Sequence, residues 1–105
     1  MVQSGYAQIT QTIRGSIVDR ETQKPLPGAT IIIPGSEPLI GTTSDEKGLF
    51  RLEKLPPGRY EIKISFVGFK TILLTNIELL SVKERVLFIE MDEEILQNKT
   101  VTINA

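Results

Sequence analysis

The sequence predicts an all-β sandwich of about seven short strands. Apolar and polar residues alternate with a period of two in several segments, and Gly, Pro, Asn and Asp separate these segments at short intervals. No segment has the length and periodicity of a long helix. A chain of 105 residues is close to the common size of a single domain with one hydrophobic core.

The first strand is expected over Ile13–Asp19, where Ile13, Gly15 and Ile17 share one face. A polar stretch follows and leads to Pro25-Leu26-Pro27-Gly28, which has the composition of a turn. The strand should therefore end at Asp19.

The next apolar run, Ala29–Ile33, is too short for a helix and stops at Pro34-Gly35. A continuous apolar run of this length indicates a strand that is buried on both faces. A weaker strand signal follows at Ile40–Thr43.

The polar segment Ser44–Gly48 separates two apolar segments and allows two interpretations. Asp45 and Glu46 carry oxygen ligands of the kind that Ca²⁺ prefers, but the alternating ligands and the distant Glu of a helix-loop-helix calcium loop are missing. A turn fits better, because an Asp side chain accepts hydrogen bonds from downstream amides and Gly48 adopts a positive φ readily.

Two further strands are expected over Leu49–Leu55 and Arg59–Val67. Pro56-Pro57-Gly58 connects them as a hairpin or a tight corner, because two consecutive prolines remove two backbone donors. In the second strand four large apolar side chains alternate with polar ones and should face the core: Tyr60, Ile62, Ile64 and Phe66.

The second half of the chain has three more strand signals, over Phe69–Thr75, Asn76–Leu80 and Glu84–Met91. The carboxylates of Asp92–Glu94 end the last of them. Because neighbouring residues of a strand point to opposite faces, these carboxylates do not form a paired acid/base site.

These alternations predict one contiguous core. Its expected members are Ile13, Ile17, Ala29, Ile31, Ile33, Phe50, Leu52, Tyr60, Ile62, Ile64, Phe66, Leu87 and Ile89.

The composition excludes several classes of function. The chain has no His and no Cys, which removes the usual general base, the commonest zinc ligands, a thiolate nucleophile and disulfide bonds. We therefore expect no enzyme activity, no cofactor and no metal. Twelve basic and thirteen acidic residues give a net charge of −1 without a basic cluster, so no nucleic-acid partner is expected. The longest apolar runs are too short to cross a bilayer as a helix, so no membrane insertion is expected.

The aromatic residues bear on carbohydrate binding, which usually needs exposed, coplanar rings. The chain has two Tyr, four Phe and no Trp. Phe50, Tyr60 and Phe66 fall on apolar strand faces, which indicates core packing. Phe69, next to Gly68, is the aromatic side chain that we expect to be exposed.

Five turn and strand motifs occur with the order and spacing of the carboxypeptidase regulatory-like domain family, which the chain therefore resembles from Ile13 to Met91. Each motif alone is a weak signal, but five in register are specific. The motifs are Gly15–Asp19 (GSIVD), Pro25–Thr30 (PLPGAT), Gly41–Phe50 (GTTSDEKGLF), Leu55–Tyr60 (LPPGRY) and Ser65–Phe69 (SFVGF).

The resemblance implies a seven-stranded prealbumin-like (transthyretin-like) Greek-key β-sandwich, a non-catalytic companion of larger cell-envelope proteins. In Gram-negative bacteria such a domain commonly follows the signal peptide and precedes the plug and barrel of SusC-type TonB-dependent outer-membrane transporters. We expect residues 1–8 to be the remnant of a secretion signal or a segment outside the natural domain. Residues 9–93 should form the sandwich, and residues 94–105 a C-terminal strand or a linker towards a following domain.

The tail Leu96–Ala105 is loosely similar to the Leu-x-x-Val-x-Val segment near the energy-coupling TonB box of those transporters, with departures at Lys99-Thr100 and Asn104. An extended segment of this kind can add as a strand to the sheet edge of a partner. An ordinary last strand or a linker is the alternative. The candidate interaction residues are Leu96, Val101, Ile103 and Phe69.

Two functional classes remain open. The first is an accessory interaction domain, exported to the periplasmic side of the outer membrane. Its expected partners are the downstream plug and barrel or other domains of the parent protein, and a TonB-system component. The second is a carbohydrate-binding or adhesive module of a secreted or surface protein, because a fold does not fix a function. A solvent-facing platform of Phe69 and Tyr6 would favour the second class.

Overall fold

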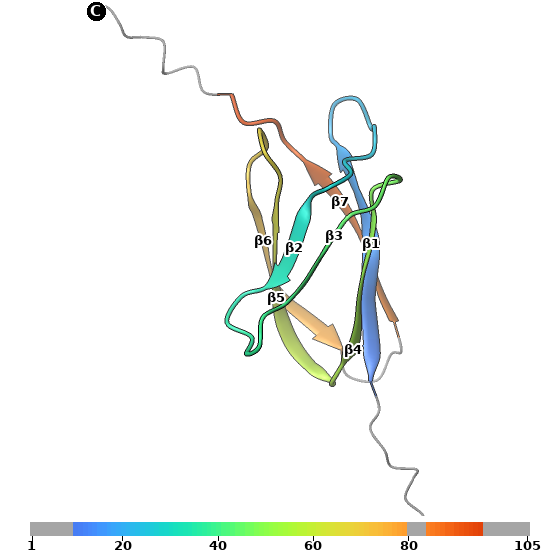
Figure 1. The fold of residues 1–105 in the computed structure, drawn as a ribbon, viewed down its shortest axis with the longest axis vertical. Helices are drawn as coiled ribbons and strands as arrows, with labels where there is room; N and C mark the ends of the chain where they lie inside the picture. Colours follow the sequence, from blue (N-terminus) through green and yellow to red (C-terminus); the bar gives the residue numbers. More distant parts are fainter. Residues whose placement is uncertain (1–9, 80–83, 96–105) are drawn as a thin grey trace, which may run out of the picture.

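The structure, a computed structural model, describes residues 10–79 and 84–95. Within these residues seven strands form two sheets that pack face to face (Figure 1). The strands are β1 (Gln11–Asp19), β2 (Thr30–Ile33), β3 (Ile40–Thr43), β4 (Leu49–Leu55), β5 (Gly58–Ser65), β6 (Ile72–Leu79) and β7 (Glu84–Met91). The expected all-β sandwich is confirmed. In the part of the chain that the structure describes, no helix is long and apolar enough to cross a membrane.

The two sheets have the strand orders β4-β1-β7 and β3-β2-β5-β6. Neighbouring strands are antiparallel with one exception: β1 and β7 are parallel, in register from Thr12 opposite Glu84 to Asp19 opposite Met91. The first strand of the domain is therefore the centre of the smaller sheet, and the last strand is one of its edges.

The core lies between the two sheets, and most of its expected members are confirmed. Ten of them are buried: Ile13, Ile17, Ala29, Ile31, Ile33, Phe50, Leu52, Ile62, Ile64 and Ile89. The other three are only partly buried and pack against this core: Tyr60, Phe66 and Leu87. Five further apolar residues are buried that the pattern did not place there: Leu26, Leu55, Ile77, Leu79 and Met91.

The expectation that Ala29–Ile33 is buried on both faces is wrong. In β2 only Ile31 and Ile33 point into the core, whereas Thr30 is exposed and Ile32 is half-buried. The outer face of the larger sheet is open to solvent, and there Ile32 lies between Gly41 of β3 and Lys63 of β5. The apolar run is therefore a strand with one covered face.

The two strands expected over Phe69–Thr75 and Asn76–Leu80 are a single strand, β6. Asn76 has a φ of 59° and accompanies a register shift against β5. A β-bulge of this kind keeps the strand continuous although its apolar alternation changes phase. The polar Thr75-Asn76 pair therefore marks a bulge and not a break.

The segment Ser44–Gly48 is a turn, as expected. The Asp45 carboxylate accepts hydrogen bonds from the amides of Lys47 and Leu49, both at 2.9 Å, and Gly48 has a φ of 77°. Ser44 is buried, and its hydroxyl donates to the Leu26 carbonyl at 2.6 Å and accepts from the Ala29 amide at 2.9 Å. The turn is thus tied to the segment that leads into β2.

Pro56-Pro57 form a corner and not a hairpin, because β4 and β5 belong to different sheets. The Tyr60 hydroxyl donates a hydrogen bond back to the Pro56 carbonyl and so closes this corner. Partial burial raises the pKa of Tyr60 above its ordinary value of 10.0. Only the protonated hydroxyl can donate this hydrogen bond.

Loss of the Tyr60 hydrogen bond is expected to destabilise the corner. Tyr60→Phe should lower the free energy of unfolding by about 0.5–1.5 kcal/mol at neutral pH. Since the folded-state pKa is raised, the hydroxyl contributes its stability below pH 10 and loses it as the pH rises through the folded pKa. Urea denaturation from pH 8 to 11 should show this alkaline loss in the unmodified chain and in Tyr6→Phe, but not in Tyr60→Phe. An equal loss in all three chains would contradict the prediction.

Candidate interaction edge

Three of the four candidate interaction residues, Leu96, Val101 and Ile103, lie outside the described residues, so their role stays a prediction. The fourth, Phe69, is half-buried, which makes the expectation of an exposed ring wrong. Its ring lies 5.6 Å from that of Phe66, and both rings pack against the core. The ring of Phe69 is therefore poorly placed to form part of a solvent-facing aromatic platform. Tyr6, the other residue expected in that platform, lies outside the described residues.

The four edge strands of the two described sheets differ in how well they are protected against pairing with another strand. Natural sheets block an edge by shortening it or by a bulge that twists it. β3 has only four residues. β4 and β6 each contain a residue with positive φ, Lys54 and Asn76, together with a register shift against the neighbouring strand. Within residues 10–79 and 84–95, β7 has eight residues in unbroken register with β1 and neither of these devices, so it is the most open of these four edges.

The middle of the outer face of β7 is apolar. Val86 is 56% exposed and Phe88 is 63% exposed. The register places Phe88 beside Ser16 of β1, and Ser16 beside Leu49 of β4, which is 46% exposed. We call Leu49, Val86 and Phe88 the β7 patch. The small Ser16 side chain at its centre leaves the ring of Phe88 uncovered.

The inner side of β7 borders a second apolar surface. A groove of about 340 Å³ runs between β7 and β6, which belong to different sheets. The apolar side chains that line the groove are Ile72, Leu74 and Ile77 of β6, with Leu87, Phe88 and Ile89 of β7. Phe88 therefore belongs both to the lining of the groove and to the β7 patch.

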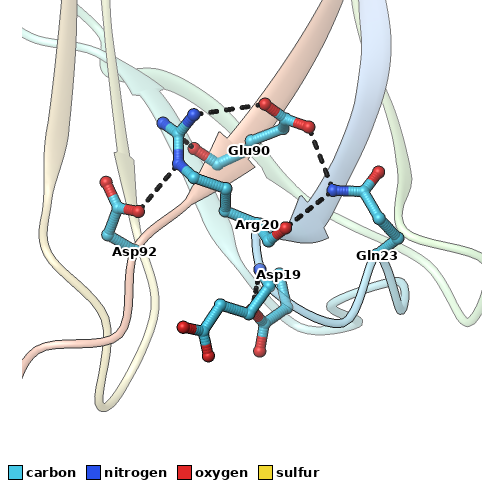
Figure 2. A network of polar contacts seen from close by, with 6 residues as sticks. Asp19, Arg20, Gln23, Glu90 and Asp92 are labelled. Atoms are coloured by element: carbon cyan, nitrogen blue, oxygen red, sulfur yellow. Dashed lines mark hydrogen bonds and ion pairs between the residues drawn. The ribbon is translucent and has the colours of Figure 1, made fainter.

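Ion pairs flank the apolar surface at both ends of β7. At its start, Arg14 Nε donates to Glu84 Oε2 at 2.8 Å, and this hydrogen bond holds the pKa of Glu84 below its ordinary value of 4.5. At its end, Arg20 lies between two carboxylates, as Figure 2 shows: its Nε is 2.8 Å from Asp92 Oδ1 and its Nη1 is 3.3 Å from Glu90 Oε1. An apolar centre with a charged rim is the common anatomy of a protein interface.

Gln23 extends the network around Arg20. Its Nε2 donates to the Arg20 carbonyl at 2.9 Å and to Glu90 Oε2 at 3.0 Å (Figure 2). Glu90 thereby receives hydrogen bonds from two side chains of the loop that follows β1. The described residues hold no group of three or more Asp or Glu side chains placed to bind a metal ion.

The arrangement can bind an extended polypeptide. A strand laid along β7 would receive backbone hydrogen bonds from its open edge. Because side chains alternate along a strand, one set would enter the groove and the other would rest on the β7 patch. The ligand that fits is an extended segment with apolar side chains on both faces.

Sequence reasoning missed this site for a physical reason. The expected core included Leu87 and Ile89, which leaves Val86 and Phe88 on the opposite face of β7, but Phe69 was the aromatic side chain expected to be exposed. An aromatic residue and a β-branched residue on that face were a usable signal, since solvent-facing strand positions are usually polar. Recognising the site also required the knowledge that β7 is an edge, which depends on pairing with β1.

The profile of the family described as CarboxypepD_reg-like domain matches residues 13–103. Among curated proteins, no relative matches this chain significantly.

Several solved structures share the fold. A chain of a type II cohesin–X-dockerin complex from Acetivibrio cellulolyticus has 21% sequence identity and a TM-score of 0.62, over 77% of this chain and 56% of that one. The 3-chlorocatechol 1,2-dioxygenase of Rhodococcus opacus 1CP has 14% identity and a TM-score of 0.63, over 89% and 63%. BcpA, the major pilin subunit of Bacillus cereus, has 18% identity and a TM-score of 0.58, over 81% and 30%. At these identities the likeness concerns the fold alone, and this chain spans less than two thirds of each of the three.

Proposed function

Because the chain belongs to the CarboxypepD_reg-like domain family, which its residues 13–103 match, we propose that it is a non-catalytic accessory domain of a cell-envelope protein. Its place is at the periplasmic side of the outer membrane, as the N-terminal extension of a TonB-dependent nutrient transporter. The five sequence motifs support this placement, because domains of the family that they resemble commonly occur at the N-terminus of such transporters. The absence of His and Cys from the chain agrees with a role in contact and not in catalysis.

The domain acts by presenting the β7 edge to an extended segment of a protein partner. The observation that carries this proposal is the unprotected edge: β7 runs for eight residues without a bulge and borders apolar surface on both sides. The partners that fit the placement are the plug of the same polypeptide and a TonB-system component. Either would supply the added strand.

Site-directed photo-crosslinking in the parent protein tests the proposal. A photoreactive amino acid in place of Phe88 should give an adduct with the plug or with a TonB-system protein in intact cells. The matched control is Val67, which is 91% exposed and lies in the connection between β5 and β6. Adduct formation from position 88 that does not exceed that from position 67 would contradict the use of this edge.

The tail needs a separate test, because Leu96, Val101 and Ile103 are candidates for the opposite role, that of the captured strand. Backbone NMR of the chain with the purified periplasmic C-terminal domain of TonB distinguishes the two. Selective amide shifts in residues 96–105 would identify a coupling segment. Shifts confined to β7 would identify the edge as the acceptor, and no shift in either would exclude TonB as the partner.

A further inference from the structure

The first and last strands of the domain lie side by side and run the same way. β1 begins at the lower end of the sandwich in Figure 1 and β7 ends at the upper end, with eight residue pairs in parallel register between them. At a rise of about 3.3 Å per residue, a strand of nine residues such as β1 separates these two ends by roughly 30 Å. The chain thus enters the domain at one pole and leaves it at the other.

This geometry decides how the domain responds to a pull on the chain. A force on the segments before β1 and after β7 draws β1 towards one pole and β7 towards the other. The two neighbours are then displaced along their common direction, so that all the hydrogen bonds of the ladder carry the load together. A pull on two strand ends at the same pole would instead open the ladder one bond at a time.

The side chains around the ladder reinforce it. On its inner side Ile13, Ile17, Ile89 and Met91 are at most 5% exposed. Water, which competes for backbone hydrogen bonds, is excluded from that side of the ladder. β1 also has β4 as its other neighbour, so it cannot be drawn out without breaking a second ladder.

The exit pole is fastened a second time. The Arg20 amide donates to the Met91 carbonyl at 3.0 Å, and the Arg20 guanidinium binds Asp92 and Glu90 (Figure 2). Beyond β7, the Lys70 amide donates to the Asp92 carbonyl and the Glu94 amide to the Gly68 carbonyl, both at 2.8 Å. The segment that leaves β7 is therefore tied to both sheets.

We infer that the domain is a tension-bearing clamp, in which the parallel β1·β7 ladder transmits a pull between the segments that flank the domain without unfolding. Tension-bearing requires only the strand order, so it does not depend on the envelope location or on the partner proposed for the β7 edge. The load that fits is a mechanical pull along the polypeptide, applied by a partner that grips the chain outside the sandwich.

Single-molecule pulling of the full 105-residue chain tests the clamp. Since the chain has no cysteine, introduced cysteine pairs define the two points of attachment without ambiguity. Attachment at Thr10→Cys and Ile95→Cys shears the ladder, whereas Thr10→Cys with Glu84→Cys opens it from one pole. We expect a several-fold higher unfolding force in the shearing geometry. Equal forces, or a lower force on shearing, would overturn the inference.

A pair of variants tests the fastening at the exit pole. Arg20→Ala removes the contacts to Asp92 and Glu90 and should lower the shearing force. The matched control is Arg59→Ala, which removes a similar exposed pair, Arg59–Glu78 at 3.1 Å, from the other sheet. We expect an unchanged shearing force in the control. An unchanged force in Arg20→Ala as well would overturn the assignment of Arg20 to the clamp.

Discussion

Replacing Gly15 by valine is expected to abolish folding of the domain. A Cβ atom at this position would lie 2.2 Å from the Leu87 carbonyl oxygen and 3.0 Å from the ring of Phe50. The first of these atoms is backbone of β7 and cannot rotate away, so β1 and β7 would have to separate. Disruption of the central strand should cost about 4 kcal/mol or more, which is exceptional for one substitution and comparable to the whole stability of a marginal domain.

Far-ultraviolet circular dichroism and thermal unfolding of Gly15→Val would measure this effect. The matched control is Ser16→Val, the next residue of β1, whose side chain is on the outer face between Leu49 and Phe88. The control should keep a cooperative transition, because the outer face has room and valine favours strands. A cooperative transition in Gly15→Val close to that of the unmodified chain would show that the strands can move apart at little cost.

The second large effect is expected for Ile62→Ala. Ile62 lies on β5, inside the larger sheet, and is completely buried. Truncation of a buried isoleucine leaves a cavity and should lower the free energy of unfolding by about 2–5 kcal/mol. The sequence placed Phe66 in the core as well, but Phe66 is half-buried and directly follows β5, so we expect a smaller loss for Phe66→Ala.

Urea denaturation measures the loss in the free energy of unfolding for both variants. An unchanged slope of the transition would confirm that the two folded states remain comparable. Leu73→Ala is the matched control, because Leu73 is on the neighbouring strand β6 and is 54% exposed. Its loss should be within about 0.5 kcal/mol, as for other surface substitutions. A loss in Leu73→Ala as large as that in Ile62→Ala would mean that burial does not decide the cost.

The local elements could be predicted because each is encoded by a few neighbouring residues. The bounds of β3, β4 and β7 agree with the expected ones, and the Asp45 turn was identified from residue types alone. The alternation of apolar residues correctly predicted that Ile62 and Ile64 of β5 point into the core. These features depend on steric and hydrogen-bonding preferences within a few residues, which one sequence contains in full.

The pairing of distant strands could not be predicted in the same way. Nothing near Ile32 indicates that its face of the sheet is uncovered, and nothing near Phe88 indicates that β7 is an edge. Leu26 stands between two prolines and was assigned to a connection, and Leu55 was placed at the end of a strand but outside the expected core, although both are buried. The candidate site was the feature that the sequence predicted least well, because an open edge is a property of the assembled sheet. The expectations for Leu96, Val101 and Ile103 remain predictions.

The parallel pairing of β1 with β7 also determines when the domain can fold during its synthesis. The Arg14–Glu84 contact joins residues 70 positions apart, so the smaller sheet lacks one of its three strands until the last of them has been made. Closing so long a loop costs conformational entropy before the stabilising contacts between the two strands can form. Chains with such distant pairings therefore fold slowly. A nascent chain that has reached only β6 leaves Ile13 and Ile17 without the side chains of Ile89 and Met91. We therefore expect the core to remain incomplete, with apolar surface exposed, until β7 has been made and closes the smaller sheet.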